Sequence, residues 1–307
     1  MLAYAFKRLL LAFAVALTVS AASFLLLRLS GDVSLAIAGE GARQADIDLV
    51  RQTYRLDRPL IIQYLEWLMR TLRGDLGQSL YFKTSVAELI AAKIGTTLIL
   101  GVCSILFALV LSLPLGVIAA LRPNSWIDRL ALTVAVVGQA LPNFFFALLL
   151  IMIFSIQLRW LPVSGSSTWA HFIMPTIALG YYVTPPIMRL VRAGMIDVMN
   201  SDFIRTAHAK GLKPAAVAIK HGLRNAMVPV VALAAVQLGF LLGGSIVIET
   251  IFALDGLGYL AYQSITHKDF PVTQAVLMLL AIAYVLLTLA ADLINTWVDP
   301  RLRTHGR

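Results

Sequence analysis

Six long stretches of the chain contain no aspartate, glutamate, lysine or arginine, and apolar residues dominate each of them. About 20 helical residues cross a hydrocarbon core about 30 Å thick. Only helices and closed barrels satisfy their backbone polar groups in lipid, and these stretches lack the alternating pattern of barrel strands. The sequence therefore predicts an all-α polytopic membrane protein with six transmembrane helices, at residues 9–27, 95–121, 130–158, 171–188, 225–248 and 270–291.

The composition indicates that lipid is the main solvent of this chain. Of its 307 residues, 59% are apolar and 13% are charged, whereas soluble domains have about 45–50% apolar and about 25% charged residues. A soluble enzyme of this length would need many more charged side chains to cover its surface. The composition therefore argues against a soluble enzyme and favours one membrane domain.

Two of the six stretches are less regular than the others. The fourth contains Pro175, Pro185 and Pro186, so we expect a helix that is kinked or broken near its basic end. The first follows Lys7 and Arg8 and has a second interpretation as a signal peptide. Its apolar run is longer than the usual signal-peptide core of about 7–15 residues, which favours a retained helix.

The distribution of lysine and arginine predicts the orientation. The side that would carry both termini holds 14 cations, against three in the short loops and span ends opposite. The long segment 31–94 has eight cations and eight acids and is too long to count. The positive-inside rule predicts cytoplasmic termini, and it accounts for the basic excess without nucleic-acid binding. The 14 cations are Lys7, Arg8, Arg122, Arg129, Arg189, Arg192, Arg205, Lys210, Lys213, Lys220, Arg224, Arg301, Arg303 and Arg307.

The sequence offers no candidate for catalysis. It contains no G-x-x-x-x-G-K-[ST] phosphate-binding loop, and its five histidines show no metal-ligand spacing. Residues 256–261 match G-x-G-x-x-A, but they follow a membrane span and lack the βαβ setting of a dinucleotide site. We therefore expect no enzyme activity, no bound cofactor and no metal in this chain.

Two segments outside the spans have helical patterns. Within 31–94, residues 47–56 and 59–72 predict short amphipathic helices, which either cap the outer ends of the spans or dock a soluble extracytoplasmic partner. Within 197–225, Ser201 can begin a helix and Gly211 can end it in a left-handed turn. Pro214 can then open a second helix with Ala216, Ile219 and Leu223 on one stripe. The pattern predicts two short helices joined at a glycine, on the cytoplasmic side.

This second segment resembles a known family. Residues 202–230 read DFIRTAHAKGLKPAAVAIKHGLRNAMVPV, which is similar to the cytoplasmic EAA loop of ATP-binding-cassette importer permeases of the dipeptide/oligopeptide type. Arg205, Thr206 and Ala207 occupy the three positions that name the motif, and Gly211 is its glycine. In that family the loop is the coupling helix, which sits in a cleft of the ATPase subunit.

The resemblance covers nearly the whole chain. The phrases LDRPLIIQYLEWL, RGDLGQSL, WLPVSG, LGGSIVIETIFALDGLG and DPRLR look like the first of the two permeases in such importers, and Ser30 departs from a proline that is frequent there. It implies the type I importer permease fold, in a bacterial inner membrane. The expected divisions are a first helix (1–30), an extracytoplasmic loop (31–94), a five-helix core (95–300) with its coupling loop (197–225), and a cytoplasmic tail (301–307).

The resemblance also implies the partners. They are a second homologous permease, two ATPase subunits that hydrolyse ATP, an extracytoplasmic solute-binding protein and membrane lipid. The coupling residues carried over from the motif and its flanks are Asp202, Phe203, Arg205, Thr206, Ala207, Lys210 and Gly211.

A few polar and small residues inside the spans are candidates for further roles. Polar groups at depth tend to face a bundle interior or an aqueous path, so Gln139, Asn143 and Gln237 either line the translocation path or bond neighbouring helices. Small residues let helices approach closely. Gly239, Gly243 and Gly244 therefore predict a close helix contact, within the subunit or with the second permease.

Two other functions compete with an importer subunit. A self-contained secondary transporter needs a buried ionisable relay, and the six stretches contain no charged residue. A membrane scaffold without transport would not account for the wide resemblance to permeases. The solute stays open among dipeptides, oligopeptides, nickel, glutathione, opines and sugars.

Overall fold

A computed structural model describes residues 2–39, 41–53 and 55–298 of the chain, which leaves the expected tail at 301–307 outside the described residues. The described residues form helices and no strands. Four helical segments among them are long and apolar enough to cross a membrane: Phe6–Leu29, Val86–Leu121, Pro214–Gly243 and Phe270–Ile294. The first, second and fourth segments lie in the helices α1 (Leu2–Ser30), α5 (Val86–Leu121) and α13 (Phe270–Val298). The third segment covers α10 (Pro214–Ala216), η2 (Val217–Leu223) and the first part of α11 (Arg224–Ile251).

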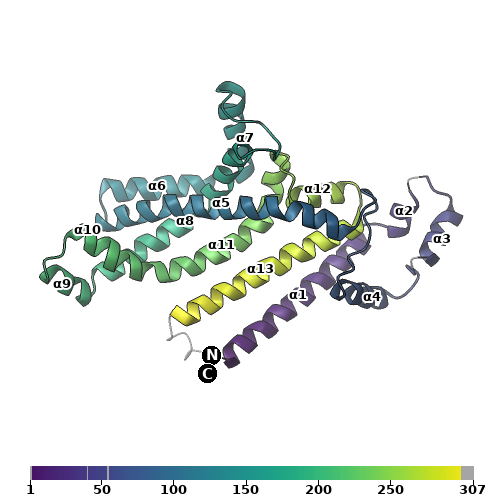
Figure 1. Ribbon diagram of the computed structural model, residues 1–307, viewed down its shortest axis with the longest axis horizontal. Coiled ribbons are helices and arrows are strands. Elements are labelled where there is room, and N and C mark those ends of the chain that lie inside the picture. The colour runs from purple at the N-terminus through teal and green to yellow at the C-terminus, as the bar shows by residue number, and fades with distance from the viewer. Residues whose placement is uncertain (1, 40, 54, 299–307) are drawn as a thin grey trace.

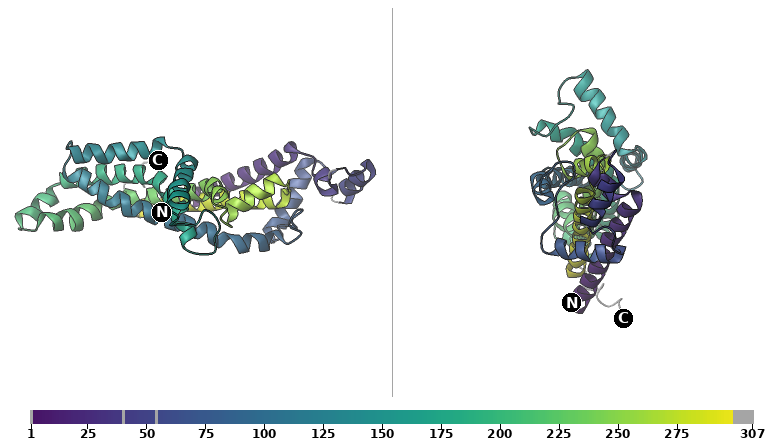
Figure 2. Two further views of the ribbon diagram at one scale, coloured as in Figure 1. Left: turned by 90° about the horizontal axis from the view of Figure 1, so that it is seen from above. Right: turned by 90° about the vertical axis from the view of Figure 1, so that its right-hand side faces the viewer.

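The molecule is elongated. Both views place the short helix α9 (Asp202–Ala209) at one end and α2 (Val33–Ala38), α3 (Gln44–Thr53) and α4 (Leu60–Leu72) at the other (Figures 1 and 2). We call these the α9 end and the α4 end. The long helices separate the two ends, so any coupling between the ends passes through these helices.

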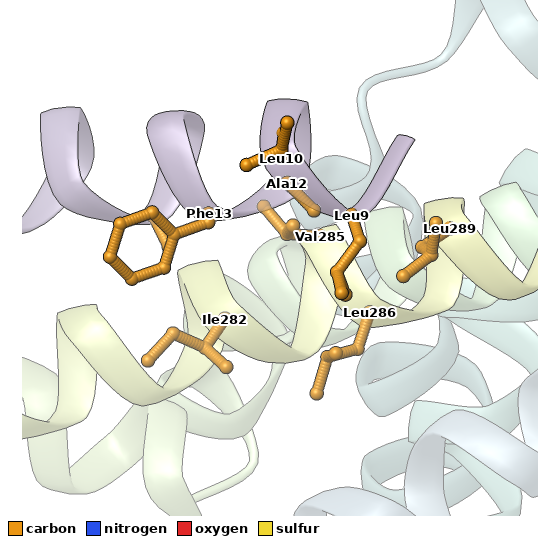
Figure 3. A pocket seen from close by; sticks show the side chains of 9 residues that line it. Leu9, Leu10, Ala12, Phe13, Ile282, Val285, Leu286 and Leu289 are labelled. Carbon is orange, nitrogen blue, oxygen red and sulfur yellow. The ribbon is translucent and has the colours of Figure 1, made fainter. Parts of the chain in front are cut away.

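The helices α1 and α13 lie side by side along the bundle (Figure 1). Arg8 of α1 and Asp292 of α13 form an ion pair at 2.8 Å. The two helices leave an apolar groove of about 390 Å³, with Phe13, Ile282 and Leu286 among its walls (Figure 3). Such a groove suits contact with lipid chains, because it offers them almost no polar atom.

The centre of the molecule is the packing of α8 (Ala170–Met199) along α5. A Cβ atom added at Gly180 of α8 would lie 2.6 Å from the Ser104 carbonyl oxygen of α5, so the two backbones are in close contact. Val183, Ile187 and Val191 of α8 are completely buried in this core. The buried face of α8 therefore continues on both sides of Pro185 and Pro186.

The fourth apolar stretch, expected to be kinked or broken near its basic end, is not broken and lies within one continuous helix. Pro175, Pro185 and Pro186 all lie inside α8. A proline inside a helix costs about 3 kcal/mol, because it removes a backbone hydrogen bond and its ring crowds the preceding turn. Here α5 and α11 pack against α8 and stabilise the helix against this cost.

The third apolar stretch, predicted as one span over 130–158, is interrupted. It forms α6 (Trp126–Ala140), α7 (Asn143–Leu150) and the π-helical segment η1 (Ile151–Gln157). Leu141 between α6 and α7 is extended, at φ −82° and ψ 123°. A residue before proline is disfavoured in the helical region, so Pro142 accounts for the interruption.

The long loop contains short helices near the two predicted positions, α3 and α4. Tyr64 of α4 is buried, and its hydroxyl lies 2.8 Å from the Ser20 hydroxyl of α1. The Phe24 ring of α1, which is also buried, packs against the rings of Tyr64 and Trp67. These contacts attach α4 to one side of α1.

A buried carboxylate joins α5, α11 and α12 (Leu257–Thr266). Glu249 of α11 accepts hydrogen bonds from the Thr97 hydroxyl of α5 at 2.8 Å, and from the backbone N–H groups of Gly258 at 2.7 Å and Tyr259 at 3.1 Å. A Cβ at Gly258 would lie 2.6 Å from the Ile246 Cα. The glycines of the G-x-G-x-x-A sequence thus let α12 close over Glu249, which gives that sequence a structural role.

Candidate functional site

The coupling loop expected from the sequence lies at the α9 end, where α8 turns into α9. Asn200 ends α8, and Ser201 precedes the first residue of α9. The Ser201 hydroxyl donates to the Val198 carbonyl at 2.6 Å, and its side chain does not cap α9. Ser201 thus lies at the predicted start of the helix, but its side chain hydrogen-bonds to the end of α8 and not to α9.

A small apolar core holds α9 against the following helix. Ile204 and Ala207 of α9 are buried together with Val217, and Val198 and Met199 of α8 pack against them. Contacts from α8 and from the helix after the turn therefore meet under α9.

The opposite face of α9 is exposed. Phe203 is 46% exposed although it is a large apolar residue. Arg205 pairs with Asp202 at 3.3 Å, but both side chains are largely in solvent, where such a pair contributes little. Arg205 is therefore available to an acidic partner. The exposed residues of the expected coupling set are Asp202, Phe203, Arg205, Thr206, Lys210 and Gly211, and Ala207 is the buried one.

Gly211 makes the turn that follows α9. Its φ is +75°, a left-handed conformation that side-chain-bearing residues rarely adopt. Its N–H donates to the His208 carbonyl at 2.9 Å, while the space where a Cβ would lie is open. Lys210 stands at the C-terminal cap of α9, where a cation complements the helix dipole.

The helix after this turn differs from the prediction of a second short helix. Pro214 begins α10 (Pro214–Ala216), which continues through the π-helical segment η2 (Val217–Leu223) into α11. The buried side is formed by Val217, Ala218 and Gly222, and Ile219 of the expected stripe is exposed. A π-helical turn includes an extra residue, which shifts every following side chain around the helix. Ala216, Ile219 and Leu223 therefore do not form the buried side of this helix.

An ion pair that the sequence analysis missed braces α8 close to α9. Arg192 of α8 binds Asp128 at the start of α6 through two nitrogens, both at 2.6 Å. Its guanidinium holds the pKa of the Asp128 carboxyl below its usual range, and the Asn124 N–H also donates to that carboxyl. These residues are 64 positions apart along the chain, so no local pattern could have paired them.

The candidate path residues lie on three helices. Gln139 is exposed on α6 and accepts a hydrogen bond from Arg189 of α8 at 3.0 Å. Asn143 begins α7, and Gln237 lies on α11; both are half-buried. Within the described part of the chain, no hydrogen bond joins any two of the three. They remain a proposal for the path.

The three candidate packing glycines all lie on α11, in different surroundings. Gly239 is buried, and a Cβ there would lie 3.0 Å from the Tyr284 ring of α13. Gly243 is exposed, with nothing within 4 Å of that position, and Gly244 follows it in the helix. Gly239 thus contacts a helix of its own subunit, whereas Gly243 leaves room for another chain.

The described residues contain no group of three or more histidine, cysteine, aspartate or glutamate side chains that could hold a metal ion. The α9 end instead has exposed apolar and basic side chains on a helix whose other face is packed against its neighbours. This arrangement suits binding to another protein.

The chain is similar to known membrane transport proteins. Residues 112–304 match the family model of the binding-protein-dependent transport system inner membrane component, and residues 1–101 match the N-terminal model of such membrane components. The glutathione transport system permease protein GsiC of Escherichia coli is 41% identical over 304 residues, which cover 99% of both chains. GsiC of Pectobacterium atrosepticum has the same identity and coverage.

Solved structures show the same fold at lower sequence identity. The inward-facing MetNI methionine ABC transporter matches 69% of this chain and 96% of its own, with a TM-score of 0.55 and 23% identity. An amino acid ABC transporter crystallised with histidines matches 70% of this chain and 94% of its own, with a TM-score of 0.50 and 18% identity.

Proposed function

Because the chain belongs to the family of binding-protein-dependent transport system inner membrane components and is a permease subunit of an ATP-binding-cassette importer, we propose that its α9 end couples the importer to ATP hydrolysis. The ATPase of such importers is a separate subunit. The observation that carries this proposal is the exposed Phe203 on a helix whose other face is buried against α8 and the helix after Gly211.

The α9 end faces the cytoplasm in this proposal, and so do both chain termini. The support is the excess of lysine and arginine on that side, 14 cations against three in the short loops opposite. The membrane is the bacterial inner membrane, where ATP is available on the cytoplasmic side alone. The α4 end then faces outwards, towards an extracytoplasmic solute-binding protein.

The assembly that we propose contains a second homologous permease and two ATPase subunits. Each permease contributes half of the translocation path, with Gln139, Asn143 and Gln237 as polar candidates for its wall. The open space beside Gly243 supports a helix contact with the second permease. ATP-driven closure of the ATPases moves α9, and α8 and α11 carry that displacement into the membrane.

The solute in this proposal is glutathione or a small peptide of similar polarity. Its support is the 41% identity to the glutathione transport system permease over 99% of both chains. The uncharged amide side chains proposed for the path can hydrogen-bond a peptide backbone without selecting for a charge. Selection among peptides then rests mainly with the solute-binding protein.

Uptake by the reconstituted importer tests the proposed solute. The chain, its partner permease, the ATPases and the binding protein are placed in proteoliposomes with ATP inside, and uptake of labelled glutathione is measured against labelled dipeptides and labelled sugar. We expect ATP-dependent uptake of glutathione or dipeptides and none of sugar. Uptake of sugar alone, or glutathione uptake that persists without ATP, would contradict the proposal.

A further inference from the structure

The α4 end contains a large cavity that the coupling function does not use. It has a volume of about 960 Å³ and lies between the end of α1, the segment of α2 to α4, and the start of α13. Figure 1 shows these elements together at one end of the molecule. The adjoining turn between α12 and α13 is firmly held, because buried Asp269 accepts hydrogen bonds from the Ser79 hydroxyl and the Tyr81 N–H.

The walls of this cavity carry a surplus of positive charge. Arg28, Arg55, Arg70 and Arg73 line it, and no described carboxylate lies within ion-pair distance of any of the four. Arg28 and Arg70 are close enough to repel each other. Neighbouring like charges raise the free energy of a site unless an anion lies between them.

The two carboxylates in the walls do not neutralise this surplus. Glu66 is paired with Arg58 at 2.5 Å. Asp75 accepts the backbone N–H of Gly77 at 2.9 Å and binds no cation among the described residues. The four arginines therefore face the cavity with Asp75 in its walls and Asp32 near Arg28 as the carboxylates that offset their charge.

Two buried amide side chains in the same walls each have an atom without a hydrogen-bond partner. Gln274 is 7% exposed, and its Nε2 donates to nothing. Gln63 is 8% exposed; its Nε2 donates to the carbonyls of Leu56 and Arg58, but its Oε1 accepts nothing. Buried polar atoms in native proteins almost always have a partner. Both atoms are covered by the surrounding protein, so they do not face the cavity, and the arginines are the groups that supply its charge.

We propose that this cavity binds a phosphate-bearing molecule. Guanidinium groups bind phosphate oxygens through paired, charge-assisted hydrogen bonds. Arg28, Arg55, Arg70 and Arg73 are the groups in the walls that supply these hydrogen bonds. A phospholipid headgroup has this chemistry, and α1 and α13 extend from the cavity into the membrane. A free phosphate ester is the other source.

Lipid retention separates the two sources. The full-length chain is purified in nanodiscs that contain phosphatidylglycerol and phosphatidylcholine, transferred to detergent, and its retained lipid is counted by native mass spectrometry. A second arm titrates the lipid-depleted chain with inorganic phosphate at fixed ionic strength, by calorimetry. The variants are Arg28→Ala and the double variant Arg70→Ala with Arg73→Ala, with Arg43→Ala as the matched control, because Arg43 is exposed and does not line the cavity.

We expect wild type and Arg43→Ala to retain phosphatidylglycerol, and affinity to fall roughly tenfold for each arginine removed. Phosphate binding in the calorimeter without lipid retention, weakened by the same variants, supports the site with a soluble ligand. Absence of both kinds of binding, or equal binding by all variants with unchanged melting temperatures, would overturn the proposal.

Discussion

Replacing Gly211 with proline is expected to abolish ATP-driven uptake while the chain still inserts into the membrane and assembles. Proline fixes φ near −65° and has no N–H, whereas Gly211 has a φ of +75° and donates to the His208 carbonyl. The turn must therefore rearrange, and Ile204 and Ala207 of α9 lose their packing against Val217. We expect uptake in proteoliposomes to fall roughly tenfold or more while ATP hydrolysis continues.

The control for this experiment is Gly39→Pro at the α4 end. Gly39 also has a positive φ, of +97°, and also donates its N–H, to the Leu35 carbonyl. In both glycines the position of an added Cβ is open. The two substitutions strain the backbone alike, at opposite ends of the molecule. Equal uptake by the Gly211 variant and wild type would exclude α9 as the transmitting element, as would equal losses in both variants.

The second large effect is expected at Glu249, where alanine should destabilise the fold by about 3 kcal/mol or more. Its carboxylate is the acceptor for the Thr97 hydroxyl and the N–H groups of Gly258 and Tyr259. Each buried donor without a partner costs about 1–3 kcal/mol. Thermal unfolding in detergent, with protease sensitivity of α12 as a local measure, gives the loss directly.

The matched control for Glu249→Ala is Glu88→Ala, because Glu88 is exposed in the first turn of α5. Its removal should change stability by less than about 0.5 kcal/mol. Glu249→Gln keeps an acceptor oxygen and should fall between alanine and wild type. Equal melting temperatures for Glu249→Ala and Glu88→Ala would show that α12 does not depend on the carboxylate.

The sequence predicts the helical membrane fold well, because long charge-free stretches have few alternatives in lipid. It also predicts the Gly211 turn, since glycine is the residue most tolerant of a positive φ. The sequence was less informative about which prolines interrupt a helix. Pro142 interrupts a helix, whereas Pro185 and Pro186 do not. The difference comes from the packing of α8 against α5 and α11, which no local pattern contains.

Packing between distant segments also determines which features of the candidate site the sequence does not predict. The motif indicated which residues belong to α9, but the exposure of Phe203 and the burial of Ala207 depend on contacts with Val217 across the turn. In the sequence Arg192 is one of the 14 cations of the expected cytoplasmic side, and its ion pair with Asp128 of α6 becomes visible only in the fold. The π-helical turn at Val217–Leu223 moved the buried face, and sequence periodicity assumes a regular helix.

Photo-crosslinking from position 203 tests the central proposal most directly. Phe203 is replaced by a photoreactive benzoyl-phenylalanine in the complete importer, and the same replacement at Phe13 of α1 serves as the control, because Phe13 is exposed along the lipid-facing groove (Figure 3). If α9 docks on the ATPase, position 203 crosslinks to the ATPase subunit in a manner that changes with ATP, and position 13 does not. An ATPase subunit that crosslinks equally from both positions, or from neither, would contradict the account.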